Sequence, residues 1–415
     1  MKRIQSFYAR STFFVVLSLT GAVINYALYP ILSRILSLSQ FGDYVTVISI
    51  SNQVMGVLLA FSVLSIAFVK QFGESEANEK AQIVQKVLLW VFSGLSIITI
   101  ILSPLLKNLL KIESIYSFLF LAIIMLVAVP ANIWSGYLQG HKEQVRVGIF
   151  SVSTALLKFL AGVALAVVAG VNGGLVGFIL GSTAGLFLLY YLPGKHVPKL
   201  NNIYSPLSAP GKEFIKSNWK YMLQAIFVVA GLVFLQNYDI NRVKALFSPE
   251  VAGVYGGVSI ISNGIYYVAF LLIWVLLPEF SLSKPANNRQ ILRTAYTLIS
   301  LLALGVVLGG YLLGDWSLAF VLGSNFANQG TTLIVAALFQ ISLVSVSLYA
   351  FYLLILKKPG STLLAGSVLA CCLVIPPFFS STPLTMITSL WGSTMLGAGI
   401  YALSSLFRKP VHSEL

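Results

Sequence analysis

One basic side chain lies inside a long apolar segment of the sequence, where it could bind an anion. Lys158 falls near the middle of residues 147–169. A lysine at the centre of a membrane-spanning helix costs roughly 2.5–3.5 kcal/mol even on a lenient insertion scale, so such residues usually have a function. The alternative is that its ammonium reaches to the membrane surface, but either surface is about half a span away. We therefore predict that Lys158 is functional.

A carboxylate and two arginines form a second set of candidates. Asp239 is the only carboxylate inside a predicted span, and Arg242 follows it after one helical turn. This spacing leaves two interpretations open: Asp239 pairs with Arg242, or it is protonated and deprotonated during ion-coupled transport. Arg34 occupies the place in the first half of the chain that Arg242 occupies in the second. The two arginines either flank an anionic headgroup or anchor their helices at the membrane surface.

Amide side chains add a polar set within the apolar segments. A single amide in a membrane helix usually bonds to a neighbouring helix. Together, the amides of the first, second, seventh and eighth predicted spans favour a polar cavity. The predicted cavity lining is Asn25, Asn52, Gln53, Gln224, Gln236, Asn237 and Asn263.

No catalytic or metal-binding pattern accompanies these residues. The sequence contains no Ser-His-Asp set, no HExxH motif and no GxxxxGK[ST] phosphate-binding loop. Cys371 and Cys372 are adjacent in an apolar stretch, where they are best interpreted as small apolar helix residues. We predict that the chain is not an enzyme, has no cofactor or metal site, and hydrolyses no ATP.

The composition indicates which elements must hold these side chains. Of the 415 residues, 58% are hydrophobic and only 9% are charged, which excludes a soluble globular protein and a disordered one. We find about twelve apolar runs, each long enough for a membrane-spanning helix. They cover residues 12–32, 44–69, 87–106, 115–138, 147–169, 175–192, 221–241, 254–277, 294–313, 331–356, 361–379 and 385–407. The first run is predicted to be an uncleaved span, and residues 314–330 are predicted to be a short surface helix.

The placement of lysine and arginine predicts the orientation. With the N-terminus in the cytoplasm, 20 of the 26 basic residues fall in cytoplasmic segments, and five fall on the opposite face. Both termini are then cytoplasmic. The net charge of +14 is explained by basic loops at anionic lipid headgroups, with no need for nucleic acid.

An internal duplication divides the predicted helices into two sets. Residues 42–52 match residues 253–263, and the Gly-Ser-Thr of 181–183 matches that of 392–394, both at a separation of 211 residues. The predicted domains are an N-terminal six-helix bundle (1–194), a proline-rich cytoplasmic linker (195–218) and a C-terminal six-helix bundle (219–415). Each repeat has an even number of spans, so a pseudo-two-fold axis along the membrane normal should relate the bundles. This all-α polytopic arrangement is typical of alternating-access transport.

Several short motifs resemble those of a known family. Residues 29–44 (YPILSRILSLSQFGDY) are similar to the early signature of polysaccharide exporters, and residues 248–255 (SPEVAGVY) to a motif of their second half. Residues 277–281 (LPEFS) resemble the segment that ends the family's eighth span. The chain thus resembles the Wzx-type O-antigen and polysaccharide flippases, within the multidrug/oligosaccharidyl-lipid/polysaccharide (MOP) exporter superfamily. Unlike Asn237, Asn25 is not followed by a nearby aspartate, so only one half carries the carboxylate.

The resemblance implies a substrate and a location. It implies that undecaprenyl-pyrophosphate-linked O-antigen or polysaccharide repeat units are flipped across the bacterial inner membrane, with ion antiport as the energy source. Lys158, Arg34 and Arg242 would bind the pyrophosphate, and Asp239 would couple transport to an ion. Partners would be the lipid-linked oligosaccharide, membrane lipids, and the polymerase and chain-length proteins. A multidrug antiporter of the same superfamily and a membrane glycosyltransferase or polymerase are the alternatives.

Overall fold

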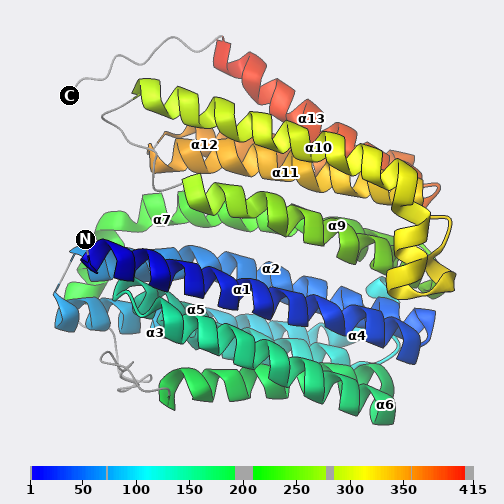
Figure 1. Ribbon diagram of the computed structural model, residues 1–415, viewed down its shortest axis with the longest axis horizontal. Helices are drawn as coiled ribbons and strands as arrows, with labels where there is room; N and C mark the ends of the chain where they lie inside the picture. Colours follow the sequence, from blue (N-terminus) through cyan, green and yellow to red (C-terminus); the bar gives the residue numbers. More distant parts are fainter. Residues whose placement is uncertain (1, 72, 192–208, 277–284, 357, 407–415) are drawn as a thin grey trace. The chain divides into compact units, whose positions relative to one another are not determined.

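The computed structural model describes residues 2–71, 73–191, 209–276, 285–356 and 358–406 (Figure 1). Over these residues the chain forms α-helices, two short 3₁₀ helices and connecting turns, with no strand. They divide into two compact units, residues 1–219 and 220–415, which are called unit 1 and unit 2 below.

Unit 1 contains two helices of 34 residues, a helix with a short continuation, a further single helix and a helical hairpin. The bounds are α1 (Lys2–Ile35), α2 (Leu38–Gln71), α3 (Glu74–Ile101), α4 (Ser103–Leu110), α5 (Tyr116–Gly140) and α6 (Gln144–Tyr191). Helix α7 (Ala209–Gln236) begins in unit 1 and continues into unit 2.

The predicted linker is partly helical. Its residues 195–208 lie outside the described residues, as does the family-like segment 277–281, whereas 209–218 belong to α7. Pro210, one of the residues that suggested a linker, lies in the first turn of α7, where a helix tolerates proline.

Unit 2 is built around one buried helix. Its elements after α7 are α8 (Tyr238–Leu246), α9 (Pro249–Leu276), α10 (Pro285–Leu322), η2 (Ser324–Phe326), α11 (Gly330–Ile355), α12 (Gly360–Val374), η3 (Pro376–Phe379) and α13 (Pro383–Leu406). Helix α11 packs against α9, α10, α12 and α13, and 72% of its apolar segment is buried, against 11% for α10. The core of this unit therefore surrounds α11.

Seven helices are long and apolar enough to cross a membrane, and the bent pair of α7 and α8 adds an eighth, within the part of the chain that was described. Helix α6 is counted once, although it contains two of the predicted spans. The remaining predicted spans fall in α2, α9 and α13, which have 34, 28 and 24 residues. About 20 residues suffice to cross the hydrocarbon core. The chain is an all-α polytopic membrane protein, as its composition predicts.

Two predicted boundaries are wrong. Residues 314–322 do not form a separate surface helix but continue α10, because Leu318 and Leu322 are buried and no proline interrupts them. The helix ends at Gly323, whose φ of 113° favours glycine. Asp315 therefore lies within α10.

The second wrong boundary is the start of α2, which begins six residues before the predicted span, so Asp43 lies within this helix. Asp239 is therefore not the only carboxylate within these helices.

Helix α6 is a hairpin of two antiparallel arms, residues 144–168 and 171–191 (Figure 1). The chain reverses at Ala169 and Gly170, where Gly170 has φ 57° and ψ −139°. A side chain there would be strained, which explains a glycine at the turn. This turn separates the two spans predicted as 147–169 and 175–192.

Candidate functional site

The ammonium of Lys158 lies on an aromatic ring in the α6 hairpin. Its Nζ is 4.0 Å from the centroid of the Phe178 ring, which comes from the second arm. Cations within about 6 Å of a ring centroid are attracted by the ring quadrupole. With the residues that the structure describes, Lys158 makes neither an ion pair nor a hydrogen bond. The three N–H donors of this lysine are thus not used by protein acceptors of the described segments.

Glycines at every fourth position bring the two arms of α6 together. They are Gly173, Gly177, Gly181 and Gly185, all on the second arm. A Cβ at Gly181 would lie 2.6 Å from the Cα of Lys158 and closer still to its backbone nitrogen. Real Cβ atoms do not approach so closely, so only glycine permits this spacing. The close packing fixes the position of the Lys158 backbone relative to the second arm and its Phe178 ring.

Asp239 lies in the first turn of α8 and is completely buried. Its Oδ2 accepts hydrogen bonds from the Tyr255 hydroxyl at 2.8 Å and the Ser259 hydroxyl at 3.3 Å. Both donors are on α9, one helical turn apart. Among the described residues, Asp239 forms no ion pair with Arg242. Of the two interpretations that the spacing leaves open, the ion pair with Arg242 does not form in the structure: the two residues lie near each other along α8, but the Asp239 carboxylate meets hydroxyl donors on α9.

Amide side chains lie at the break between α7 and α8, close to Asp239 along the chain. The two helices meet at Asn237 and are bent by 51°. The Gln340 side chain on α11 donates to the backbone carbonyl of Gln236 at 2.8 Å, which satisfies one of the groups that the break exposes. The Asn263 amide is 3.5 Å from both the Asn237 Oδ1 and the Ser259 hydroxyl.

We call this set of buried and partly buried side chains the α8–α9 polar cluster. Its members are Gln236, Asn237, Asp239, Tyr255, Ser259, Asn263 and Gln340. The Oδ1 oxygen of Asp239 makes no close hydrogen bond within the described part of the chain, although the backbone N–H groups of Asp239 and Ile240 lie near the carboxylate. A buried carboxylate that accepts hydroxyl hydrogen bonds at one oxygen is suited to taking up a proton or a cation.

The other predicted site residues do not join this cluster. Arg34 is exposed, and its Nη1 donates to the Pro30 carbonyl of its own helix at 2.7 Å. Asn25 likewise donates to the Gly21 carbonyl at 3.1 Å. Gln224 donates to the Lys358 carbonyl at 3.1 Å and the Ser361 hydroxyl at 2.8 Å, and so connects α7 to the start of α12.

Three further predicted residues lie outside the cluster. Arg242 is partly buried on α8. Asn52 and Gln53 are partly buried on α2 of unit 1, whereas the cluster belongs to unit 2. Of the seven amides predicted to line a cavity, the structure thus brings three together around Asp239: Gln236, Asn237 and Asn263.

Sequence reasoning missed Phe178, Tyr255, Ser259 and Gln340. The spacing of Tyr255, Ser259 and Asn263 is a readable signal, because residues four apart share one face of a helix. Nothing in the sequence points to Gln340 or Phe178, whose roles depend on which helices pack together.

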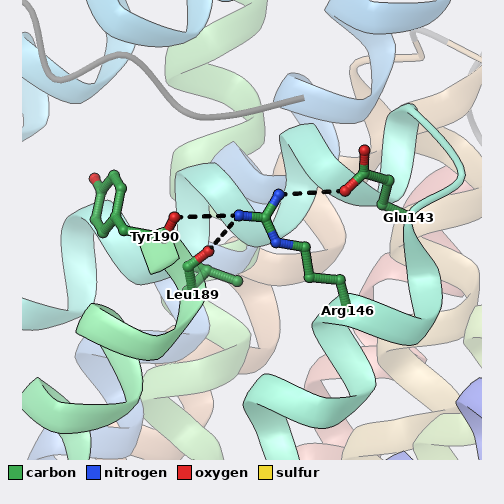
Figure 2. Close-up of polar contacts among 4 residues, drawn as sticks. All are labelled: Glu143, Arg146, Leu189 and Tyr190. Carbon is green, nitrogen blue, oxygen red and sulfur yellow. Dashed lines mark hydrogen bonds and ion pairs between the residues drawn. The ribbon is translucent and has the colours of Figure 1, made fainter. Parts of the chain in front are cut away.

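A buried arginine closes the open end of the α6 hairpin, as Figure 2 shows. The Nη2 of Arg146 donates to the carbonyls of Leu189 at 2.8 Å and Tyr190 at 3.4 Å, and its Nη1 is 3.3 Å from Glu143. These carbonyls belong to the last turn of the second arm, where a helix favours a positive charge. Arg146 is one of the basic residues predicted to fall in cytoplasmic segments, and in the structure it is only 6% exposed.

Solved structures resemble nearly the whole chain at low sequence identity. A structure described as the lipid II flippase MurJ in an inward closed conformation has a TM-score of 0.65 and 14% identity, and covers 96% of this chain and 88% of its own. An inward-facing multidrug resistance MATE transporter of the MOP superfamily has a TM-score of 0.67 and 13% identity, covering 96% and 97%. The MATE multidrug transporter DinF-BH has a TM-score of 0.65 and 16% identity, again covering 96% and 97%. No family model and no curated protein sequence matches the chain.

These likenesses define the class of fold. The chain has the fold of MOP-superfamily transporters, which place twelve helices in two lobes. Its neighbours in this fold are flippases and multidrug transporters rather than enzymes.

Proposed function

We propose that the chain is a flippase that moves undecaprenyl-pyrophosphate-linked oligosaccharide across the bacterial inner membrane by alternating access. The observation that carries this proposal is Lys158, a cation within a membrane span that makes no ion pair or hydrogen bond with the described residues. A phosphate group supplies the charge and the acceptor oxygens that such an ammonium lacks. The cytoplasmic orientation of both termini, predicted from the basic loops, belongs to this proposal.

The proposal assigns different tasks to the two charged sites. Lys158 binds the pyrophosphate, with Arg242 and Arg34 as secondary cations near the membrane surface. The α8–α9 polar cluster couples transport to an ion, because Asp239 is a buried carboxylate whose protonation removes its charge. The MurJ-like fold supports a lipid-linked substrate.

The direct test replaces Lys158 in the full-length chain reconstituted into liposomes. Lys158→Ala should abolish flipping of a fluorescent undecaprenyl-pyrophosphate-linked glycan, and Lys158→Arg should retain part of it because the charge remains. Lys107→Ala, which removes a lysine from the short helix α4, is the control and should flip normally. Normal flipping by a well-expressed Lys158→Ala variant would reject the proposal.

A second test concerns Asp239. Asp239→Asn keeps the shape and the hydroxyl donors Tyr255 and Ser259 but removes the charge. We expect this variant to bind cargo normally and to lose the stimulation of flipping by an imposed ion gradient. Thr297→Val, which removes an exposed hydroxyl on α10 that bonds to the Arg293 carbonyl of its own helix, is the control for polarity changes. Unchanged coupling in Asp239→Asn would exclude this carboxylate as the coupling site.

A multidrug cation antiporter is the second candidate function. The buried carboxylate Asp239 favours it, since a cationic drug or ion needs a negative partner, and two of the similar folds are multidrug transporters. Efflux of a lipophilic cationic dye from the same liposomes distinguishes the two. Dye transport that is abolished by Asp239→Asn and unaffected by Lys158→Ala would favour the antiporter.

A further inference from the structure

We infer that Phe178 is a positioning residue that keeps the Lys158 ammonium charged and oriented for the anionic group of the cargo. This inference rests on the proposed function of Lys158. It starts from the 4.0 Å separation between Nζ and the ring centroid. The attraction between a cation and a ring face is stronger when both are removed from water, as they are within a membrane span.

A ring serves this purpose better than a carboxylate. A carboxylate would neutralise the lysine and would have to be displaced each time an anion bound. An aromatic face stabilises the charged amine without accepting conventional hydrogen bonds. Consistent with this, Lys158 has no carboxylate partner among the described residues. The N–H groups that point away from the ring meet no hydrogen-bond acceptor among the described residues.

The ring is held in place by the packing of the hairpin. Phe178 is only 7% exposed and directly follows Gly177, whose Cβ would lie 2.5 Å from the Cα of Gly162. One turn later, Gly181 is pressed against the backbone of Lys158. The lysine and the ring are thus attached to two backbones that cannot shift apart without losing this close packing.

The test compares variants of Phe178 in the full-length chain in lipid nanodiscs, with undecaprenyl pyrophosphate as the probe. Phe178→Leu should weaken binding roughly tenfold at pH 7 and more at pH 9, because the ring stabilises only the charged amine. Phe178→Tyr keeps the ring face and should bind within about threefold of the original protein. Phe187→Leu, which removes an exposed ring from the same arm, should have no effect. Equal binding by Phe178→Leu at both pH values, or equal losses in the Leu and Tyr variants, would overturn the inference.

A second measurement separates this inference from the proposed function. Only the neutral amine reacts with a membrane-permeant acylating reagent, so the acylation rate of Lys158, measured by peptide mass spectrometry, reports its charge without any cargo. Acylation at pH 8 should be several-fold faster in Phe178→Leu than in the original protein or in Phe178→Tyr. If the probe does not bind even the original protein, the proposed function fails, but faster acylation would still support the positioning role. Equal acylation rates would reject that role.

Discussion

The two units place the same tyrosine in different surroundings. Tyr44 and Tyr255 each stand two residues after a glycine in the duplicated segment. In unit 1 the Tyr44 ring packs edge-on against the Tyr29 ring, with centroids 6.3 Å apart. In unit 2 the Tyr255 hydroxyl donates to the buried carboxylate of Asp239. The matching segments carry the tyrosine ring in both units, whereas only the Tyr255 hydroxyl of unit 2 donates to a carboxylate.

The helical hairpins of the two units also differ, and here the charged residue is in unit 1. In unit 1, α6 is a tight hairpin whose glycines bring the Lys158 backbone against the second arm. In unit 2, α12 and α13 are joined through η3, and Gly397 is pressed against the backbone of Val368, an uncharged residue. Unit 1 therefore carries the cation, and unit 2 the buried carboxylate, that the proposed function uses. The two units therefore carry different charged sites.

The largest expected effect comes from Gly181, with Gly392, the glycine at the matching place in the sequence repeat, as its control. Gly181→Ala introduces a Cβ 2.6 Å from the Lys158 Cα, so the arms must separate, whereas a Cβ at Gly392 meets nothing within 4 Å. We expect Gly181→Ala to lower stability by about 3 kcal/mol or more. Gly392→Ala should be neutral or stabilising by up to about 1 kcal/mol. Thermal unfolding in detergent measures both, and equal effects would contradict the role of Gly181 in the packing of the α6 hairpin.

An intermediate effect is expected from the matched tyrosines. Tyr255→Phe removes a donor from a buried carboxylate, which should cost about 1–3 kcal/mol of stability. Tyr44→Phe removes a hydroxyl that meets no carboxylate among the described residues and should change stability by less than about 0.5 kcal/mol. Chemical denaturation of both variants in mixed micelles checks the difference. A larger loss for Tyr44→Phe would show that the comparison of the two rings is wrong.

The smallest expected effect comes from the matched asparagines. Asn237→Ala removes the contact with Asn263 at the break between α7 and α8, which should cost about 0.5–1.5 kcal/mol. Asn25 bonds to a carbonyl of its own continuous helix, so Asn25→Ala should cost less than about 0.5 kcal/mol. The same denaturation measurement applies. Indistinguishable variants would mean that the break does not depend on the Asn237 side chain.

The sequence predicts the helices well because long apolar runs have few alternatives within a membrane. It also carries a signal for the hairpin, since Gly173, Gly177, Gly181 and Gly185 recur at every fourth position. The ends of helices are harder to predict. Asp43 and Asp315 are polar residues that a hydropathy pattern excludes from a span, but each bonds to a neighbouring backbone N–H, of Glu113 at 2.9 Å and Gly330 at 2.6 Å.

The candidate site is predictable in its residue types more than in its contacts. Lys158 and Asp239 stand out because charges are rare in apolar runs. Their partners cannot be predicted, because the Phe178 ring and the Tyr255 hydroxyl come from other helical segments. The pairing of Asp239 with Arg242 fails for the same reason: spacing along one helix does not show which neighbouring helix offers better donors.

The α6 hairpin has a consequence for how the chain enters the membrane during synthesis. A lone span with a lysine at its centre is a poor substrate for insertion, because the charge has no partner in lipid. The second arm brings Phe178 to that charge, and the bonds from Arg146 to Leu189 and Tyr190 join the free ends of both arms. We expect the translocation machinery to retain the first arm until the second has been made, so that the two arms pass into the bilayer as one piece.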